Sequence, residues 1–391
     1  MRIAIVSTLY PPEDGGGIAT YCRHLAESLA SQGHHVRIIC RTQDQERVDH
    51  LNGVEVHRFR QRYLPLVENR FPGLAWSWFV RQTLIRWQNT SGLDAVEFSN
   101  WEGVGLMTSI LPRQFPVITR LVTPYFESLN ISATMELKSA DRFICGMEQK
   151  AVQYSDRLIT STRHHAVMMA GNYHLDADAI TVIPLGIELP PLPETPAPAP
   201  AKPELDVLYV SRLELRKGTL TLLEAIPRVL QQMPGVRFTF IGQDRPHAPG
   251  KRLFKEYFQQ TWPEHTAQVK FLGFQPEATV EAAYASCDLF VVPSKYESFG
   301  LIYVEAMARG KPVIGCTSGG IPEVIKHPEA GLVIPPDDPE KLAQSILQLA
   351  NDEGLREQMG KNARRWTEDK FDKAQMAANT LKAYQAAGSD R

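Results

Sequence analysis

Residues 293–312 read Pro-Ser-Lys-Tyr-Glu-Ser-Phe-Gly-Leu-Ile-Tyr-Val-Glu-Ala-Met-Ala-Arg-Gly-Lys-Pro, and apolar runs precede and follow this stretch at 288–293 and 312–315. The runs predict two buried strands, and the residues between them predict a helix at 299–309. Gly310 and Pro312 stand where that helix has to end. A strand, a helix and a second strand in this order indicate a parallel sheet covered by helices.

The same alternation recurs along the whole chain. In the second half we expect strands at 207–210, 236–241 and 269–272 and helices at 217–232 and 277–285. In the first half we expect a strand at 3–7, a glycine-rich turn, a helix at about 18–31 and a strand at 35–40. The expected fold class is therefore α/β, with doubly wound sheets of the Rossmann kind.

A proline-rich segment joins the two halves. Seven prolines occur in the fourteen residues 190–203, a composition that forms an extended spacer and neither a helix nor an interior strand. We therefore expect a first domain at 1–186, a linker at 187–203 and a second domain at 204–372. Doubly wound sheets bind ligands where their strands end, so we expect the site in a cleft between the domains.

The composition is that of a globular protein from reducing surroundings. Five cysteines occur without a CxxC pair, which argues against a disulfide framework and against a zinc site. A formal net charge of −2 gives no overall attraction to nucleic acid. No run approaches about eighteen apolar residues, and residues 1–10 suit a buried strand better than a signal peptide. We expect a soluble, cytoplasmic protein.

The stretch quoted first contains a candidate anion site. Glu297 follows a predicted strand, and Ser298 suits a helix N-cap. The backbone N–H groups of Phe299, Gly300 and Leu301 would then open the helix, where they and the helix dipole favour a diphosphate. The alternative interpretation of Glu297 is a capping carboxylate without a ligand.

Three further side chains could complete this site. Arg212 and Lys217 follow the strand expected at 207–210, and two cations at the opening of a helix can neutralise a pyrophosphate and stabilise its departure. Glu305 lies farther along the helix expected at 299–309, where its carboxylate could accept hydrogen bonds from ribose hydroxyls. The alternatives are a solvated basic turn and a solvated helix glutamate.

Several segments together resemble one enzyme family. The pattern Ser-Arg-x4-Lys-Gly at 211–218, combined with Glu297 and Glu305, resembles the retaining GT-B glycosyltransferases of family 4. Further segments that follow the family's order are 10–18, 183–187, 271–274, 287–294 and 319–323. The resemblance is strongest from about 205 to 340 and weakest from about 45 to 95, which suits a shared donor domain and a divergent acceptor domain.

The resemblance implies a GT-B fold, in which two Rossmann-like domains face each other across a cleft and a last helix at 373–391 packs back on the first domain. It implies transfer of a sugar from a nucleotide-sugar donor, a UDP-sugar by family frequency, to a hydroxyl acceptor with retention of configuration. It also implies that neither a metal nor a cofactor is required. Asp176-Ala-Asp178 matches the metal-binding motif of another transferase fold only superficially, and it lies outside the cleft segments.

The resemblance also implies roles for single residues. Arg212, Lys217 and Glu297 would be catalytic, because the two cations would hold the diphosphate and the carboxylate would contact the hydroxyls of the sugar. Glu305 would hold the ribose. The remaining donor-binding positions would be Ser298, Phe299, Gly300 and Leu301 around the diphosphate, Gly16 and Gly17 from the first domain, and Gly273 and Phe274 beside the base. The base itself stays open among UDP, GDP and ADP.

One position departs from the family's pattern. Members commonly carry a histidine after a strand of the first domain, but this chain has Val122 there, which can neither donate a hydrogen bond to a sugar nor polarise it. Two alternatives therefore stand beside the transferase: a nucleotide-sugar-binding protein with reduced or lost turnover, and a GT-B phosphorylase or epimerase. We expect His164 and His165 to form an exposed pair at the start of a helix.

The acceptor side is predicted from two segments. Residues 57–88 hold six arginines and seven aromatic residues, which suit a membrane surface, a lipid-linked acceptor or a carbohydrate. The alternative is a helix that packs its aromatic residues in the core and turns its arginines to water. Glu102 follows an expected strand and could bind an acceptor hydroxyl, with Arg120 and Val122 on the same side. The acceptor could be a saccharide, a lipid-linked molecule or a small molecule. We expect the protein in the cytoplasm, either free or associated with the inner face of the membrane.

Overall fold

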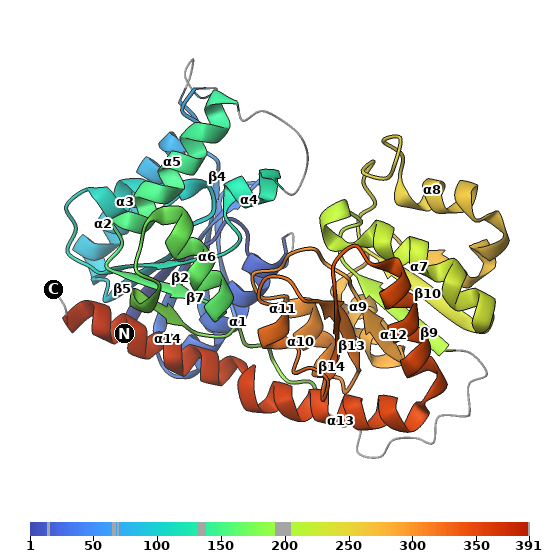
Figure 1. Ribbon diagram of the computed structural model, residues 1–391. Coiled ribbons are helices and arrows are strands. Elements are labelled where there is room, and N and C mark those ends of the chain that lie inside the picture. Colours follow the sequence, from blue (N-terminus) through green and yellow to red (C-terminus); the bar gives the residue numbers. More distant parts are fainter. Residues whose placement is uncertain (14–15, 65–67, 69, 131–137, 192–204, 390–391) are drawn as a thin grey trace. The chain divides into compact units, whose positions relative to one another are not determined.

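The computed structural model describes residues 1–13, 16–64, 68, 70–130, 138–191 and 205–389 (Figure 1). The chain divides into two compact units. Unit 1 comprises Met1–Glu188 and Asp372–Arg391, and unit 2 comprises Leu189–Phe371. Most of the expected linker, from residue 192 onward, lies outside the described residues.

Unit 1 is built on an eight-stranded sheet in the order β3-β4-β2-β1-β5-β6-β7-β8. Its strands are β1 (Arg2–Val6), β2 (His35–Thr42), β3 (Arg47–Leu51), β4 (Val54–Arg60), β5 (Ala95–Ser99), β6 (Val117–Arg120), β7 (Arg157–Thr160) and β8 (Ile180–Val182). β3 pairs with β4 in the antiparallel sense, and the other neighbours pair in parallel. The chain leaves β1 toward β2 on one side and returns to β5 on the other, so β1 and β5 flank the switch point where doubly wound sheets bind ligands.

The helices of unit 1 are α1 (Gly17–Ser31), α2 (Leu74–Ser91), α3 (Leu106–Ile110), α4 (Tyr125–Asn130), α5 (Ser139–Gln153), α6 (Arg163–Tyr173) and α14 (Lys373–Ser389). α14 lies against α1 although the two are at opposite ends of the chain (Figure 1). A core cluster joins α2 to the sheet: Trp76, Val80, Leu84 and Trp87 pack with Ala4, Val6, Val96 and Phe98. Burial of these apolar side chains is the main force that holds the helix on the sheet.

The basic and aromatic segment at 57–88 is not one helix, because it spans the end of β4, a loop and α2. Trp76 and Trp87 are buried in the core, whereas Trp78 is 48% exposed. The expectation that its arginines face water is wrong for Arg58, which is fully buried. Arg58 donates hydrogen bonds of 2.8 Å to the carbonyl oxygens of Tyr10 and Pro11, so it holds the loop that follows β1.

Unit 2 is built on a six-stranded parallel sheet in the order β11-β10-β9-β12-β13-β14. Its strands are β9 (Leu205–Val210), β10 (Val236–Ile241), β11 (Val269–Phe271), β12 (Leu289–Val291), β13 (Val313–Cys316) and β14 (Gly331–Ile334). Its helices are α7 (Thr219–Gln232), α8 (Phe254–Thr261), α9 (Glu277–Ser286), α10 (Leu301–Met307), α11 (Ile321–Val324), α12 (Pro339–Asn351) and α13 (Glu353–Lys370). The α/β class and two Rossmann-like sheets are thus confirmed.

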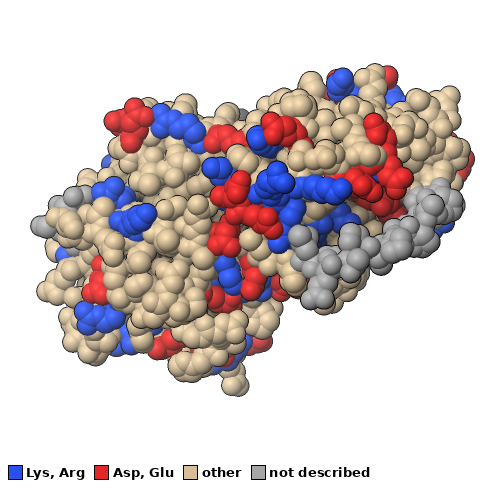
Figure 2. Space-filling model, turned by 90° about the horizontal axis from the view of Figure 1, so that it is seen from below, with Lys and Arg blue, Asp and Glu red and all other residues tan. Residues whose placement is uncertain are grey.

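The surface carries charges of both signs. On the face shown in Figure 2, Lys and Arg side chains lie beside Asp and Glu side chains. Within the described ranges, no helix is both long and apolar enough to cross a membrane.

Candidate active site

A buried ion pair marks the carboxyl edge of the sheet of unit 2. β9 pairs with β12, so the loops that follow these two strands are neighbours. Nζ of Lys217, from the loop after β9, lies 2.5 Å from Oε1 of Glu297, from the loop after β12. The two side chains are only 12% and 11% exposed. Ser294 donates a hydrogen bond of 2.9 Å to the same oxygen, and Nη1 of Arg216 lies 3.9 Å from Oε2 of Glu297.

Glycines allow the backbones around Glu297 to approach each other. Gly319 has a φ of 62°, and a Cβ there would lie 2.2 Å from the carbonyl oxygen of Glu297. Gly320 donates a backbone hydrogen bond of 2.8 Å to that oxygen. Gly218 has a φ of 67°, and a Cβ there would lie 1.8 Å from the carbonyl oxygen of Pro293. Side chains at Gly218 and Gly319 would therefore clash with the backbone of the loop of Glu297 and displace it.

The electrostatic surroundings keep Glu297 ionised. Burial works to raise the pKa of Glu297, but the charges of Lys217 and Arg216 outweigh it and hold that pKa below its ordinary value. Burial lowers the pKa of Lys217, and the like charge of Arg216 adds to this against the attraction of Glu297. Because Glu297 has two cationic neighbours, an incoming anion could bind one of them while the other still balances the charge of Glu297.

Further cations line the same edge. Nη1 of Arg212 is 3.1 Å and Nη1 of Arg245 is 3.7 Å from Oε1 of Glu214. Arg212 was expected here, whereas Arg216, Arg245 and Ser294 were not among the sequence candidates. Arg216 lies inside the motif at 211–218, and Arg245 follows the end of β10. The position of each arginine just after a strand is the feature of the sequence that could have identified it as a site residue.

The start of α10 differs from the expectation. Ser298 is not its N-cap, because the helix begins at Leu301 with Gly300 at the cap position and a φ of 95°. A Cβ on Gly300 would lie 2.7 Å from the ring of Tyr303, so the turn into the helix needs glycine at this position. The side chain of Phe299 is buried and packs edge-to-face on Phe371.

The three other donor-side predictions in unit 2 have distinct surroundings. Oε2 of Glu305 accepts a hydrogen bond of 2.9 Å from the buried hydroxyl of Tyr284 on α9. Gly273 follows β11 with a φ of 68°, and its carbonyl oxygen accepts a bond of 2.8 Å from the backbone of Gly242. This bond joins the loop after β11 to the loop of Arg245. The ring of Phe274 is 75% exposed beside it.

In unit 1, the glycine-rich loop leads directly into a helix. Gly16 occupies the N-cap position of α1, and Gly17 is its first residue. A Cβ on either glycine would meet no atom within 4 Å. The preceding residues 14 and 15 lie outside the described ranges.

The acceptor-side candidates separate into two environments. Glu102 follows β5 and forms an ion pair of 2.8 Å with Arg41 at the end of β2. Val122 follows β6, and its backbone N–H donates a bond of 2.6 Å to Oδ1 of Asn100. Arg120, by contrast, is not available to a ligand, because its guanidinium is buried in an ion pair of 3.0 Å with Glu97.

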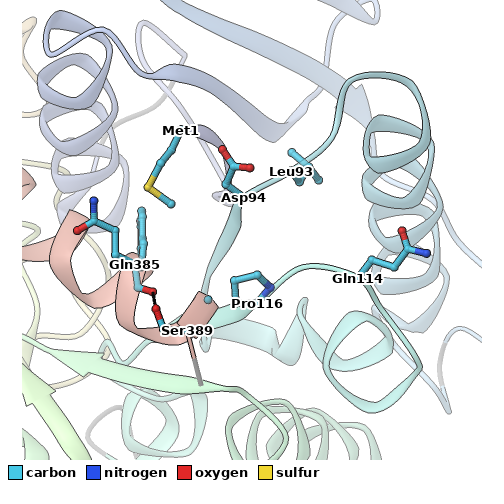
Figure 3. A pocket seen from close by; sticks show the side chains of 9 residues that line it. Met1, Leu93, Asp94, Gln114, Pro116, Gln385 and Ser389 are labelled. Carbon is cyan, nitrogen blue, oxygen red and sulfur yellow. Dashed lines mark hydrogen bonds between the residues drawn. The ribbon is translucent and has the colours of Figure 1, made fainter. Parts of the chain in front are cut away.

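Two of the cavities formed by the described residues lie in unit 1. Gln45, Glu46, Arg60 and Arg62 line one of about 450 Å³ beside the carboxyl ends of β2 and β4. The other, of about 500 Å³, lies at the amino ends of β1 and β5, where Figure 3 shows Met1 and Asp94 across from Gln385. Only the first is on the edge where ligands of such sheets bind.

The histidine prediction holds for one residue of the pair. His164 is exposed, but His165 is fully buried, and its Nδ1 lies 2.6 Å from the hydroxyl oxygen of Thr160. Burial lowers the pKa of His165 to about 3, so its ring is neutral at physiological pH. In the part of the chain that the structure describes, no three His, Cys, Asp or Glu side chains gather as a metal site would require.

Two Rossmann-like units, with cations, a carboxylate and glycines gathered where the strands of unit 2 end, are typical of the GT-B glycosyltransferases. A model of the family described as Glycosyl transferases group 1 matches residues 194–366, and a model of Glycosyltransferase Family 4 matches residues 15–189. The chain belongs to this family of glycosyltransferases.

Similar proteins cover the chain from end to end. An uncharacterised glycosyltransferase of Methanocaldococcus jannaschii is 28% identical over 99% of this chain and 98% of its own length. Sucrose-phosphate synthase from Thermosynechococcus elongatus has the same fold, with a TM-score of 0.80, 23% identity and complete coverage of both chains. The Anabaena protein HepE, solved with UDP-glucose, superposes with a TM-score of 0.74 at 19% identity over 99% of this chain and all of its own.

Proposed function

We propose that this protein is a retaining glycosyltransferase that moves a sugar from a nucleotide-sugar donor to a hydroxyl group of an acceptor. The observation that carries the proposal is the buried pair of Lys217 and Glu297 at the carboxyl edge of unit 2, with Arg212 and Arg216 beside it. In this proposal Lys217 and Arg212 hold the diphosphate, Glu297 binds hydroxyls of the sugar and Glu305 binds the ribose.

The charges of the site suit a diphosphate. Four cations, Arg212, Arg216, Lys217 and Arg245, stand with two carboxylates, Glu214 and Glu297. The excess positive charge would stabilise the negative charge that develops on the phosphate as the bond to the sugar breaks. In the proposed reaction the acceptor hydroxyl attacks the sugar on the face from which the phosphate departs, and it passes its proton to the departing phosphate oxygen. The reaction therefore needs neither a protein nucleophile nor a metal.

A UDP-sugar is our first choice of donor. The support is the Anabaena protein of the same fold, which was solved with UDP-glucose. For the acceptor, we propose that the Glu102–Arg41 pair and the cavity of Arg60 and Arg62 contact a saccharide, a lipid-linked molecule or a small molecule. The five cysteines are free, which supports a place in the cytoplasm.

Two other proposals have a specific observation in their favour. Val122 offers an apolar side chain where a histidine is usual, which favours a donor-binding protein with reduced turnover. Tyr63 and Trp78 are 64% and 48% exposed in the arginine-rich segment 57–88, which would suit association with the inner face of a membrane. Sedimentation with anionic vesicles would test the second: a Trp78→Ala variant that sediments as the wild type does would count against it.

The main proposal is tested by binding and turnover together. We expect UDP and UDP-sugars to raise the melting temperature in a screen that includes GDP, ADP and their sugars, because a ligand that binds only the folded state stabilises it. We also expect slow release of free sugar from the bound UDP-sugar, measured by chromatography. Stabilisation without release, with every acceptor tried, would favour the binding protein. Formation of a sugar 1-phosphate in place of free sugar, with orthophosphate required, would favour a phosphorylase. Neither stabilisation nor release with any nucleotide would contradict the proposal.

A further inference from the structure

Glu148 on α5 is a fully buried carboxyl group that the proposed chemistry does not use. Its Oε1 accepts hydrogen bonds of 2.9 Å from the backbone N–H of Glu102 and 3.3 Å from the backbone N–H of Tyr125. Its Oε2 accepts bonds of 3.0 Å from the backbone N–H of Tyr125 and 3.1 Å from the hydroxyl of Tyr173. A buried carboxyl group is costly unless such bonds compensate it, so this set of partners is the feature to be explained.

Two of these partners belong to the loops at the carboxyl edge of unit 1. Glu102 lies in the loop after β5, and Tyr125 follows the loop after β6. The same loops are also bonded to each other, because Oδ1 of Asn100 accepts the N–H of Val122 at 2.6 Å. One carboxyl group therefore holds, from α5, both of the loops that present the acceptor-side candidates.

The loop after β5 needs this support. Glu102 has a φ of 56°, a left-handed conformation that is unfavourable for a residue other than glycine. Gly103 follows with a φ of 61°, and a Cβ there would lie 2.5 Å from the Cβ of Met147. The loop is thus pressed onto α5 in a strained conformation. In this conformation the carboxylate of Glu102 reaches Arg41 at the end of β2.

We infer that Glu148 is a positioning residue, which sets where Glu102 and Val122 stand by holding the backbone N–H groups of Glu102 and Tyr125. The inference rests on the proposed glycosyl transfer and adds to it a residue that touches neither substrate. Its role is to fix the acceptor-side loops of unit 1, whereas Lys217, Glu297 and Glu305 of the proposed donor site belong to unit 2.

Glu148→Gln tests the inference with almost no change in side-chain volume. An amide has one accepting oxygen, and its nitrogen only donates. If the amide oxygen replaces Oε2, the N–H of Glu102 loses its acceptor; if it replaces Oε1, the N–H of Tyr125 keeps only its longer bond of 3.3 Å. We expect release of sugar from UDP-glucose, or from whichever UDP-sugar the wild type hydrolyses, to fall at least about tenfold. The Kd for UDP, measured by calorimetry, should stay within about twofold, and amides at 100–105 and 121–126 should exchange hydrogen faster.

Tyr173→Phe is the matched control. It removes the third hydrogen bond to the same carboxyl but leaves both loop contacts in place, so it should keep sugar release within about twofold of wild type. The inference is overturned if Glu148→Gln releases sugar and exchanges its loop amides as the wild type does, or if Tyr173→Phe loses as much release as Glu148→Gln. A wild type that neither binds UDP nor releases sugar would instead refute the proposed function, and loop exchange would still decide on Glu148.

Discussion

Nζ of Lys217 and Oε1 of Glu297 lie 2.5 Å apart, although the two residues are separated by 80 positions in the chain. The pairing of β9 with β12 brings their loops together, and each charge is the other's nearest counter-ion. A bound diphosphate would compete with Glu297 for Lys217. Binding of the donor is therefore expected to turn Glu297 from a partner of Lys217 into a ligand for the sugar.

Gly319→Ala should disturb this pair through the backbone. The new Cβ would lie 2.2 Å from the carbonyl oxygen of Glu297 at a φ of 62°. We expect the free energy of unfolding to fall by about 1–3 kcal/mol and sugar release to fall by about 100-fold, because Glu297 is displaced. Urea denaturation and the release assay measure the two effects. Gly171→Ala, on the exposed side of α6 with no atom within 4 Å, is the control and should stabilise the protein by up to about 1 kcal/mol.

Tyr284→Phe should weaken recognition of ribose. The tyrosine hydroxyl is bonded to Oε2 of Glu305 and so fixes the orientation of that carboxylate. We expect the Kd for UDP to rise about 3- to 10-fold, the usual worth of one buried hydrogen bond. The Kd for 2′,3′-dideoxyuridine diphosphate should not change, because it lacks the hydroxyls that Glu305 would bind. Equal weakening of both nucleotides in calorimetry would show that Tyr284 acts on the fold alone.

Arg120→Met should affect stability and leave the affinity for UDP unchanged. The substitution leaves Glu97 buried without its cation, although the hydroxyls of Tyr21 and Tyr384 still contact it at 3.3 Å and 2.8 Å. We expect the free energy of unfolding to fall by about 3–5 kcal/mol in urea denaturation, and the double variant with Glu97→Leu to recover much of it. A loss below about 1 kcal/mol in the single variant would argue that the ion pair is not structural.

The stability of the protein should depend on pH through Glu148. Burial raises the pKa of Glu148 from its ordinary 4.5 to about 8, and the charge of Glu102 acts in the same direction, against the bonds from Tyr125 and Tyr173. The folded state therefore holds a proton that the unfolded state releases above about pH 4.5. This contribution to stability is complete below that pH and is lost as the pH rises through about 8.

Urea denaturation between pH 5 and pH 8.5 measures this effect. The contribution of Glu148 to the free energy of unfolding should decline by up to about 1.4 kcal/mol per pH unit. The difference in stability between the wild type and Glu148→Gln should therefore change steadily over this range. Parallel curves for the two proteins would mean that the pKa of Glu148 is not raised.

Much of the fold was accessible from the sequence, because strand periodicity and glycines are local signals. The strand expected at 236–241 is β10 (Val236–Ile241). The helix expected at 217–232 begins later, at Thr219, because Lys217 ends a 3₁₀ turn and Gly218 takes a left-handed conformation. Serine is a common N-cap residue, so the sequence predicts Ser298 as the cap, whereas in the structure Gly300 occupies the cap position in a left-handed conformation and the helix begins at Leu301.

Contacts between distant residues were not accessible in the same way. Arginine is usually solvated, so nothing local shows that Arg58 is buried against the loop of Tyr10. Likewise, Arg120 meets Thr380 from α14, which is 260 positions away in the chain. The sequence identified Lys217 and Glu297 as candidate ligands, but it did not show that they form an ion pair.

Glu297→Gln tests the central claim most directly, when UDP binding and sugar release are measured on the same preparation. If Glu297 serves the sugar, release should fall by about 100-fold or more while the Kd for UDP falls or rises by less than about threefold, because the lost interaction is with the sugar and Lys217 is freed for the diphosphate. Glu357→Gln on the exposed side of α13 should leave both values at the wild-type level. Equal losses of UDP affinity and sugar release in Glu297→Gln, or unchanged release, would contradict the account.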